Sequence, residues 1–252
     1  MAVLLPVHGS DMKLVGVFLV LSLLTGCGQT TLTNSPAGSS PPSIQASEST
    51  VNPSIPAGES ILLTTEDNVH LAANLYPSDG DVAVVFAHMG IADQTSWSTF
   101  ASDIAQAGMP ALTFDFRCFG NSECFTDYTQ ISNVKDVRAG IAYLRSQGYQ
   151  RIACVGASMG ATACLNATLQ EELAGLVFIA GDTALRVSSL SYPEDMVSPG
   201  MPKLFIVADN DPYGKVIADT LYYYEISPQP KGYIHYPEMA HGTELFNTAH
   251  GS

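Results

Sequence analysis

The clearest candidate for chemistry in this sequence is a serine between two glycines. Residues 156–160 read G-A-S-M-G, directly after the apolar, β-rich run 152–155 and before a helix-compatible run at 161–169. This is the G-x-S-x-G pattern in the strand–turn–helix context that it requires. So tight a turn strains the backbone of Ser158, and glycine two positions to either side avoids collisions with the neighbouring strand or helix. The pattern predicts a nucleophilic serine with the free N–H groups of a helix beside it.

A serine hydroxyl is a poor nucleophile at neutral pH, so Ser158 needs a base and a group that orients the base. Histidine suits the first role because its pKa lies near neutrality, and a carboxylate can fix the tautomer of the histidine. Asp211 and His241 lie in the loops 208–214 and 237–242, which follow the last two predicted strands. Asp209 is the rival for the acid, and Asp182 is a more distant alternative. The favoured set is Ser158, Asp211 and His241.

The elements around these residues alternate between strand and helix. This rhythm favours an α/β fold with a mostly parallel, eight-stranded sheet and helices on both faces. The serine follows the fifth strand, and all three candidate residues lie at carboxyl ends of strands, where open α/β sheets hold their ligands. The predicted strands are 61–65, 69–76, 82–87, 110–116, 152–155, 173–180, 203–208 and 232–236, and the predicted helices are 96–107, 133–147, 161–169 and 216–224.

From about residue 58 to residue 246 the sequence resembles the α/β-hydrolase family, in which nucleophile, acid and histidine follow one another in this order. The resemblance implies an oxyanion hole made by the backbone N–H groups of Met159 and Met89. It also places His88 and Gly90 in the substrate-binding loop after the third strand, where His88 shapes the loop through hydrogen bonds and is not a base. Met89 stands where many members of the family carry glycine, so the shape of the pocket does not follow from the resemblance.

The predicted domain contains four cysteines, an even number for an exported protein. Cys118 stands where the family's D-x-R-G-x-G-x-S loop, resembled here by residues 115–122, has a glycine. Cys118 and Cys124 are the favoured disulfide pair, which would stiffen the rim of the site. Cys154 and Cys164 flank the serine on its strand and helix; they could pair, or remain buried free thiols.

The first 57 residues are expected to be an export leader and a tether. Lys13 and the apolar run 14–24 suit a secretory signal, and L-T-G-C at 24–27 resembles a bacterial lipobox with Cys27 as the lipidated residue. An ordinary signal peptide is the alternative, and translation could start at Met1 or Met12. Residues 28–57 are rich in Ser, Thr, Pro and Gly, which predicts a flexible linker before the domain at 58–252. We therefore expect an extracytoplasmic protein anchored to a bacterial membrane.

Charge and motif content exclude several classes of partner. The formal net charge is −14, which argues against binding to nucleic acid and against electrostatic adhesion to anionic lipid. No cluster of His, Cys or Asp has metal-ligand spacing, and no Gly-rich phosphate loop occurs, so the sequence implies no metal and no cofactor. Nothing in the sequence sets the oligomeric state.

These features together predict a serine hydrolase, with a carboxylic ester of modest size as its small-molecule substrate. Only residues 181–202 are available for a lid, so we expect little or no cap. A peptidase and a thioesterase or acyltransferase of the same fold are alternatives. A fourth possibility is a non-catalytic binding protein on a hydrolase fold, although all three residue types of the triad are present. Fold-level resemblance cannot select the substrate.

Overall fold

The computed structural model describes residues 58–124, 132–182 and 200–247. The expected leader with Cys27, the linker at 28–57 and most of the segment available for a lid therefore lie outside the described residues. Within the described ranges, no helix is both long enough and apolar enough to cross a membrane.

Eight strands form one sheet in the order β1-β2-β4-β3-β5-β6-β7-β8. The pairs β1–β2 and β2–β4 are antiparallel, and all the others are parallel. Every residue of β3, β4 and β6 is buried, as expected of central strands covered on both faces. The strands are β1 (Glu59–Thr64), β2 (His70–Tyr76), β3 (Val82–Ala87), β4 (Ala111–Phe114), β5 (Arg151–Ala157), β6 (Gly175–Ile179), β7 (Lys203–Ala208) and β8 (Lys231–Tyr236).

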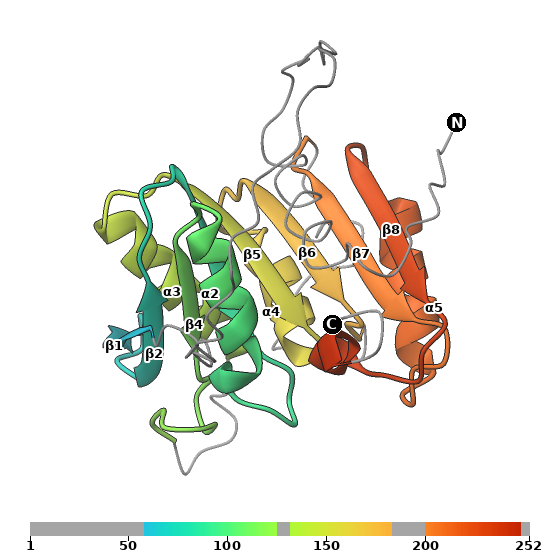
Figure 1. The fold of residues 1–252 in the computed structure, drawn as a ribbon, viewed down its shortest axis with the longest axis horizontal. Helices are drawn as coiled ribbons and strands as arrows, with labels where there is room; N and C mark the ends of the chain where they lie inside the picture. Colours follow the sequence, from blue (N-terminus) through green and yellow to red (C-terminus); the bar gives the residue numbers. More distant parts are fainter. Residues whose placement is uncertain (1–57, 125–131, 183–199, 248–252) are drawn as a thin grey trace, which may run out of the picture.

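Helices cover both faces of the sheet (Figure 1), so the predicted fold class is confirmed. The buried apolar side chains of α3 and α4 belong to one cluster, in which Phe178 of β6 also meets Tyr223 of α5. On the other face, Trp97 packs between Phe86 of β3 and Phe246 near the end of the described chain. The helical segments are η1 (Gln94–Trp97), α2 (Ser98–Gln106), α3 (Asn133–Ser146), α4 (Met159–Ala167), α5 (Lys215–Ile226) and η4 (Gly242–Asn247).

Two predicted helices differ from the observed ones. The predicted helix 96–107 is divided into the 3₁₀ helix η1 and the α-helix α2, because the Asp93 side chain accepts a hydrogen bond from Thr95 N and starts a tight first turn. In the resembled family a final helix follows the histidine, and here the segment after His241 forms the 3₁₀ helix η4. Neither difference moves a candidate site residue to another element.

The sheet order brings the predicted site residues to one edge. The carboxyl ends of β3, β5, β7 and β8 lead into the loops that carry His88, Ser158, Asp211 and His241. Parallel pairing places these ends at the same edge of the sheet, at the bottom of the view in Figure 1. Because β3 lies directly beside β5, the loop after β3 adjoins the turn that carries Ser158.

Candidate active site

Ser158 occupies a strained turn between β5 and α4. Its backbone has φ 52° and ψ −116°, a conformation that costs a non-glycine residue about 1–3 kcal/mol and is tolerated only where the surroundings enforce it. A Cβ atom at Gly156 would lie 2.3 Å from Gly160 O, and one at Gly160 would lie 2.2 Å from Ala87 O. Both glycines are therefore required by the close approach of backbone to backbone. The side chain of Ser158 is thereby held at a partly exposed position.

The loop after β3 packs against the start of α4, as the predicted oxyanion hole requires. Gly160 packs directly against the carbonyl groups of Ala87 and His88. A Cβ atom at Gly90 would lie 3.8 Å from Met159 Sδ. The structure thus brings Met89 and Met159 into neighbouring segments beside Ser158. That their backbone N–H groups stabilise an oxyanion stays a prediction.

Asp211 and His241 form a buried pair. Asp211 Oδ2 lies 2.8 Å from His241 Nδ1, and the exposed fractions of the two side chains are 0% and 5%. Asp211 Oδ1 also accepts a hydrogen bond from Tyr213 N at 2.9 Å, which fixes the carboxylate. A carboxylate only accepts, so Nδ1 carries a hydrogen, and in the neutral imidazole this leaves the lone pair on His241 Nε2. That tautomer is the one that can remove a proton from a hydroxyl group.

The two rival acids have other partners. Asp209 contacts His235 Nδ1 at 2.8 Å, in a pair whose side chains are about half exposed. The Asp182 carboxylate contacts Lys215 Nζ at 2.7 Å. Of the three aspartates considered, the structure therefore places Asp211 against His241.

The segment that carries His241 also reaches the serine turn. A Cβ atom at Gly242 would lie 3.3 Å from Ala157 Cβ and 2.9 Å from Met89 Sδ. Among the residues that the structure describes, no hydrogen bond links Ser158 Oγ to His241. Hydrogen bonds of this kind are often long in free enzymes and tighten with substrate. The packing of Gly242 accordingly brings the base, the nucleophile and the β3 loop to one place.

His88 is fully buried, and both of its ring nitrogens meet the backbone. Nε2 accepts a hydrogen bond from Phe116 N at 3.0 Å, so Nδ1 must carry the proton and donates it to Met89 O at 2.8 Å. Burial lowers the pKa of His88, which favours this neutral form. The ring therefore ties the β3 loop to the chain after β4 and fixes the Met89 carbonyl. Direct contact of His88 or Gly90 with substrate stays a prediction.

Two positioning residues escaped the sequence prediction. Glu244 Oε2 accepts a hydrogen bond from His241 N at 2.9 Å, and Glu244 N donates to His241 O at 3.0 Å. Tyr213 lies against the imidazole of His241, with ring centroids 4.5 Å apart. The H-x-x-E spacing resembles a capping box, which could have indicated Glu244. Tyr213 has no comparable signal, since its contact depends on how the two loops meet.

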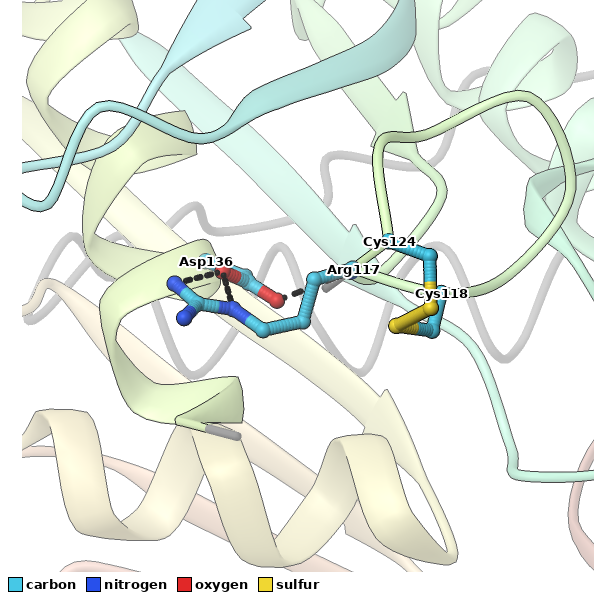
Figure 2. Close-up of a disulfide and its surroundings, with 4 residues drawn as sticks. All are labelled: Arg117, Cys118, Cys124 and Asp136. Atoms are coloured by element: carbon cyan, nitrogen blue, oxygen red, sulfur yellow. Dashed lines mark hydrogen bonds and ion pairs between the residues drawn. A yellow bond between two sulfur atoms is a disulfide. The ribbon is translucent and has the colours of Figure 1, made fainter. Parts of the chain in front are cut away.

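The loop after β4 is anchored by buried charges. The Asp115 carboxylate accepts hydrogen bonds from Gln94 N and Asn121 N, both at 2.9 Å. Arg117 donates through Nε to Asp136 Oδ1 at 2.8 Å, and neither side chain of this pair is exposed. In Figure 2 the Arg117 side chain reaches Asp136 of α3, while the disulfide lies farther along the same loop. This buried pair fixes the loop that faces the β3 segment.

Both candidate disulfides are formed. The favoured pairing of Cys118 with Cys124 is confirmed, and Cys154 is bonded to Cys164, which the sequence left open. Cys118 has φ 66°, a left-handed conformation that glycine adopts without strain. This explains why the D-x-R-G-x-G-x-S loop of the family carries glycine at this position. The second bridge joins β5 to α4 on either side of Ser158.

Comparison with known proteins bears on the family and on the fold. Residues 84–248 match the family described as the alpha/beta hydrolase family. An esterase of Pyrococcus furiosus has a similar structure, with a TM-score of 0.62 at 18% identity over 79% of this chain and 90% of that chain. A predicted CIB-like hydrolase from Thermoplasma acidophilum gives 0.59 at 18% identity over 71% and 86% of the two chains. An alpha-beta serine hydrolase homologue from Coxiella burnetii gives 0.55 at 16% identity over 70% and 86%. No curated protein matches the sequence. At these identities the structural likeness establishes the fold.

Proposed function

The chain belongs to the α/β-hydrolase family, and from this premise we propose that it is a serine hydrolase that cleaves carboxylic esters. The observation that carries the proposal is the buried contact of 2.8 Å between Asp211 and His241, together with the packing of the segment after His241 beside the strained turn of Ser158. A buried carboxylate–imidazole pair next to a strained serine is the arrangement that activates a hydroxyl group for acyl transfer.

The proposed reaction has two halves. His241 Nε2 takes the proton of Ser158 as Oγ attacks the ester carbonyl, and the same nitrogen then returns the proton to the departing alcohol. This leaves an acyl group on Ser158. In the second half His241 Nε2 removes a proton from water as the water oxygen attacks the acyl carbonyl. The bond between the acyl carbon and Ser158 Oγ then breaks, His241 returns the proton to Oγ, and the acid is released. Asp211 holds the imidazole in the required tautomer and stabilises its protonated form.

The negative oxygen that forms in each half needs donors in place beforehand. We assign this role to the backbone N–H groups of Met159 and Met89. The contact between the β3 loop and α4 supports the assignment, as does the link of His88 to the Met89 carbonyl. Loss of one such donor typically lowers kcat by about 10²–10³-fold.

We also propose that the enzyme acts outside the cytoplasm, attached to a membrane through a lipid on Cys27. The support is the L-T-G-C sequence at 24–27 after an apolar run, followed by a Ser/Thr/Pro-rich stretch. The anchor would position the enzyme at a membrane surface without any contribution from its acidic domain.

The proposed activity is tested with the purified protein and a series of p-nitrophenyl esters, from acetate through butyrate to octanoate. We expect turnover by the wild type that is lost in Ser158→Ala. A folded wild-type protein whose rate equals that of the variant would contradict the proposal. It would favour a peptidase, a narrow specialist or a non-catalytic protein on the same fold.

A further inference from the structure

A cavity lies beside the candidate oxyanion loop. It is wide open to solvent and has a volume of about 570 Å³; among the described residues its lining comes from the loop after β3, from the first turn of η1 and from the loop after β4. The members are Gly90, Ile91, Ala92, Asp93, Thr95, Ser96, Phe119 and Gly120. Ser158 is not among them. Gly90 connects the two places, because a Cβ atom at Gly90 would lie 3.8 Å from Met159 Sδ, next to the serine.

The lining of this cavity is mixed: it has two large apolar side chains, the hydroxyl groups of Thr95 and Ser96, and the carboxyl group of Asp93. Ile91 and Phe119 supply the large apolar side chains. Hydrogen bonds from Thr95 lower the pKa of Asp93, so its carboxylate is ionised at neutral pH. An anionic group would be repelled there, whereas an uncharged apolar group would gain contacts. The cavity suits the apolar part of a neutral ester.

Phe119 is held in this wall from two directions. Its ring packs edge-on against His88, with centroids 5.2 Å apart, and its backbone N donates to Phe116 O at 2.9 Å. On the other side, the residue directly before it is cross-linked to Cys124. Cys118 N also donates to Glu123 O at 2.9 Å, which closes the same loop. The bridge therefore stabilises the segment that presents Phe119 to the cavity.

One end of the disulfide, Cys118, lies at a position where the backbone conformation disfavours any side chain. Cys118 has φ 66°, where a side chain is strained and glycine is not. A cysteine at this point keeps the left-handed turn and adds a covalent link across the loop. A cross-link restricts the alternative conformations of a loop, so the disulfide can hold Phe119 in one place. Glycine at position 118 would leave the segment with more accessible conformations.

We propose that Phe119 sets the size of the apolar group that the substrate site accepts, and that the Cys118–Cys124 disulfide positions Phe119 for this role. The proposal rests on the proposed ester hydrolase function, and it assigns a substrate class to the same site: neutral esters whose apolar group fits beside Phe119. Phe119 acts on substrate selection and takes no part in the chemistry at Ser158.

The test compares kcat/KM for p-nitrophenyl octanoate with kcat/KM for the acetate, in the full chain. The ratio cancels any effect on the chemistry common to both substrates, including one transmitted through His88. Phe119→Ala and the milder Phe119→Leu enlarge the cavity. Cys118→Gly combined with Cys124→Ser removes the bridge while glycine tolerates the left-handed turn. Phe100→Ala is the matched control, since Phe100 packs on Phe86 and Trp97 and does not line the cavity.

We expect the octanoate-to-acetate ratio to rise at least about tenfold in Phe119→Ala, in line with the effect of changing a pocket by a few methylene groups. The ratio should rise less in Phe119→Leu, move in the same direction in the bridge variant, and remain that of the wild type in Phe100→Ala. Reaction with a fluorophosphonate, which labels an activated serine, should continue at Ser158 in all of these proteins.

Three negative results are distinguishable. If the wild type is labelled at Ser158 but the ratio is unchanged in both Phe119 variants, Phe119 does not select the substrate and this inference fails alone. If the ratio changes in the Phe119 variants but not in the bridge variant, the positioning role of the disulfide is wrong. If the wild type is neither labelled nor active, the proposed function fails, and this inference fails with it.

Discussion

Among single residues, the carboxylate that contacts His241 decides how the imidazole is oriented. Asp209 and Asp211 lie two positions apart in the loop after β7, yet Asp211 contacts His241 and Asp209 contacts His235. Position within the resembled family favoured Asp211. The residue pattern alone could not show which of the two aspartates faces His241. Side chains alternate between the two faces only within a strand, and β7 ends at Ala208, before both aspartates.

The two aspartates provide a matched pair of substitutions. Asp211→Asn should lower kcat by about 10⁴-fold, because an amide can hold the imidazole in the wrong tautomer while the fold is kept. Asp209→Asn removes the same charge from the same loop and should leave kcat nearly unchanged. Steady-state kinetics on one active ester measures both. Equal losses in the two variants would contradict the assignment of the acid.

The buried His88 makes a prediction about stability and pH. Burial lowers its pKa in the folded protein, although the hydrogen bond to Met89 and the charges of Asp115 and Asp93 act in the opposite direction. In the unfolded chain histidine has a pKa of about 6.5, so below that pH the unfolded state binds a proton that the folded state does not. The contribution of neutral His88 to the free energy of unfolding is therefore present above about pH 6.5. It is lost as the pH falls from there toward the lower pKa of His88 in the folded protein.

Urea denaturation of the wild type and His88→Asn at pH 7 and pH 5 tests this sign. The wild type should lose more free energy of unfolding between the two pH values than the variant does. The difference cannot exceed about 1.4 kcal/mol per pH unit for one proton. If both proteins lose the same amount, His88 is not the buried neutral group described above.

At the scale of elements, the strands and helices were predictable, but the contacts between loops were not. The continuous apolar run at 82–87 indicated β3, and the glycine spacing indicated the turn at Ser158. The pair of Arg117 with Asp136 joins the loop after β4 to α3, and no local pattern connects these two positions. Glu244 could have been found from its spacing to His241. Tyr213 depends on how two loops meet in space.

The Arg117–Asp136 pair predicts a large loss of stability. Asp136→Asn would leave Arg117, whose side chain is 0% exposed, without its buried counter-charge, although Asp67 would remain in contact. Removing one partner of a buried ion pair typically costs about 3–5 kcal/mol. Asp81→Asn is the control, since Asp81 is 83% exposed in its pair with Arg151 and should matter little. Thermal or urea unfolding measures both; a loss in Asp136→Asn no larger than in the control would contradict the account.

At the scale of the whole molecule, the alternation of strand and helix was enough for the fold class. It was not enough for the sheet order, in which β4 lies between β2 and β3. Hydrophobic pattern shows that a strand is buried but not which strand lies beside it. Four cysteines allow three pairings, so the bond between Cys154 and Cys164 also needed the structure.

The proposed anchor makes a prediction for the full-length protein in a bacterial cell. Cys27→Ser should leave the leader attached or release the protein from the membrane fraction, because lipid attachment and cleavage both require the cysteine. Cell fractionation and the mass of the mature protein measure the outcome. A variant that fractionates with the membrane and has a mass differing only by the substitution would contradict lipidation at Cys27.

Whether Ser158 is an activated nucleophile is decided by ester turnover of the wild type measured beside Ser158→Ala. We expect measurable hydrolysis of short p-nitrophenyl esters by the wild type, and a loss in kcat of several orders of magnitude, up to about 10⁶-fold, in the folded variant. Hydrolysis that persists unchanged in Ser158→Ala, or a folded wild type with no turnover of any ester in the series, would contradict this role of Ser158.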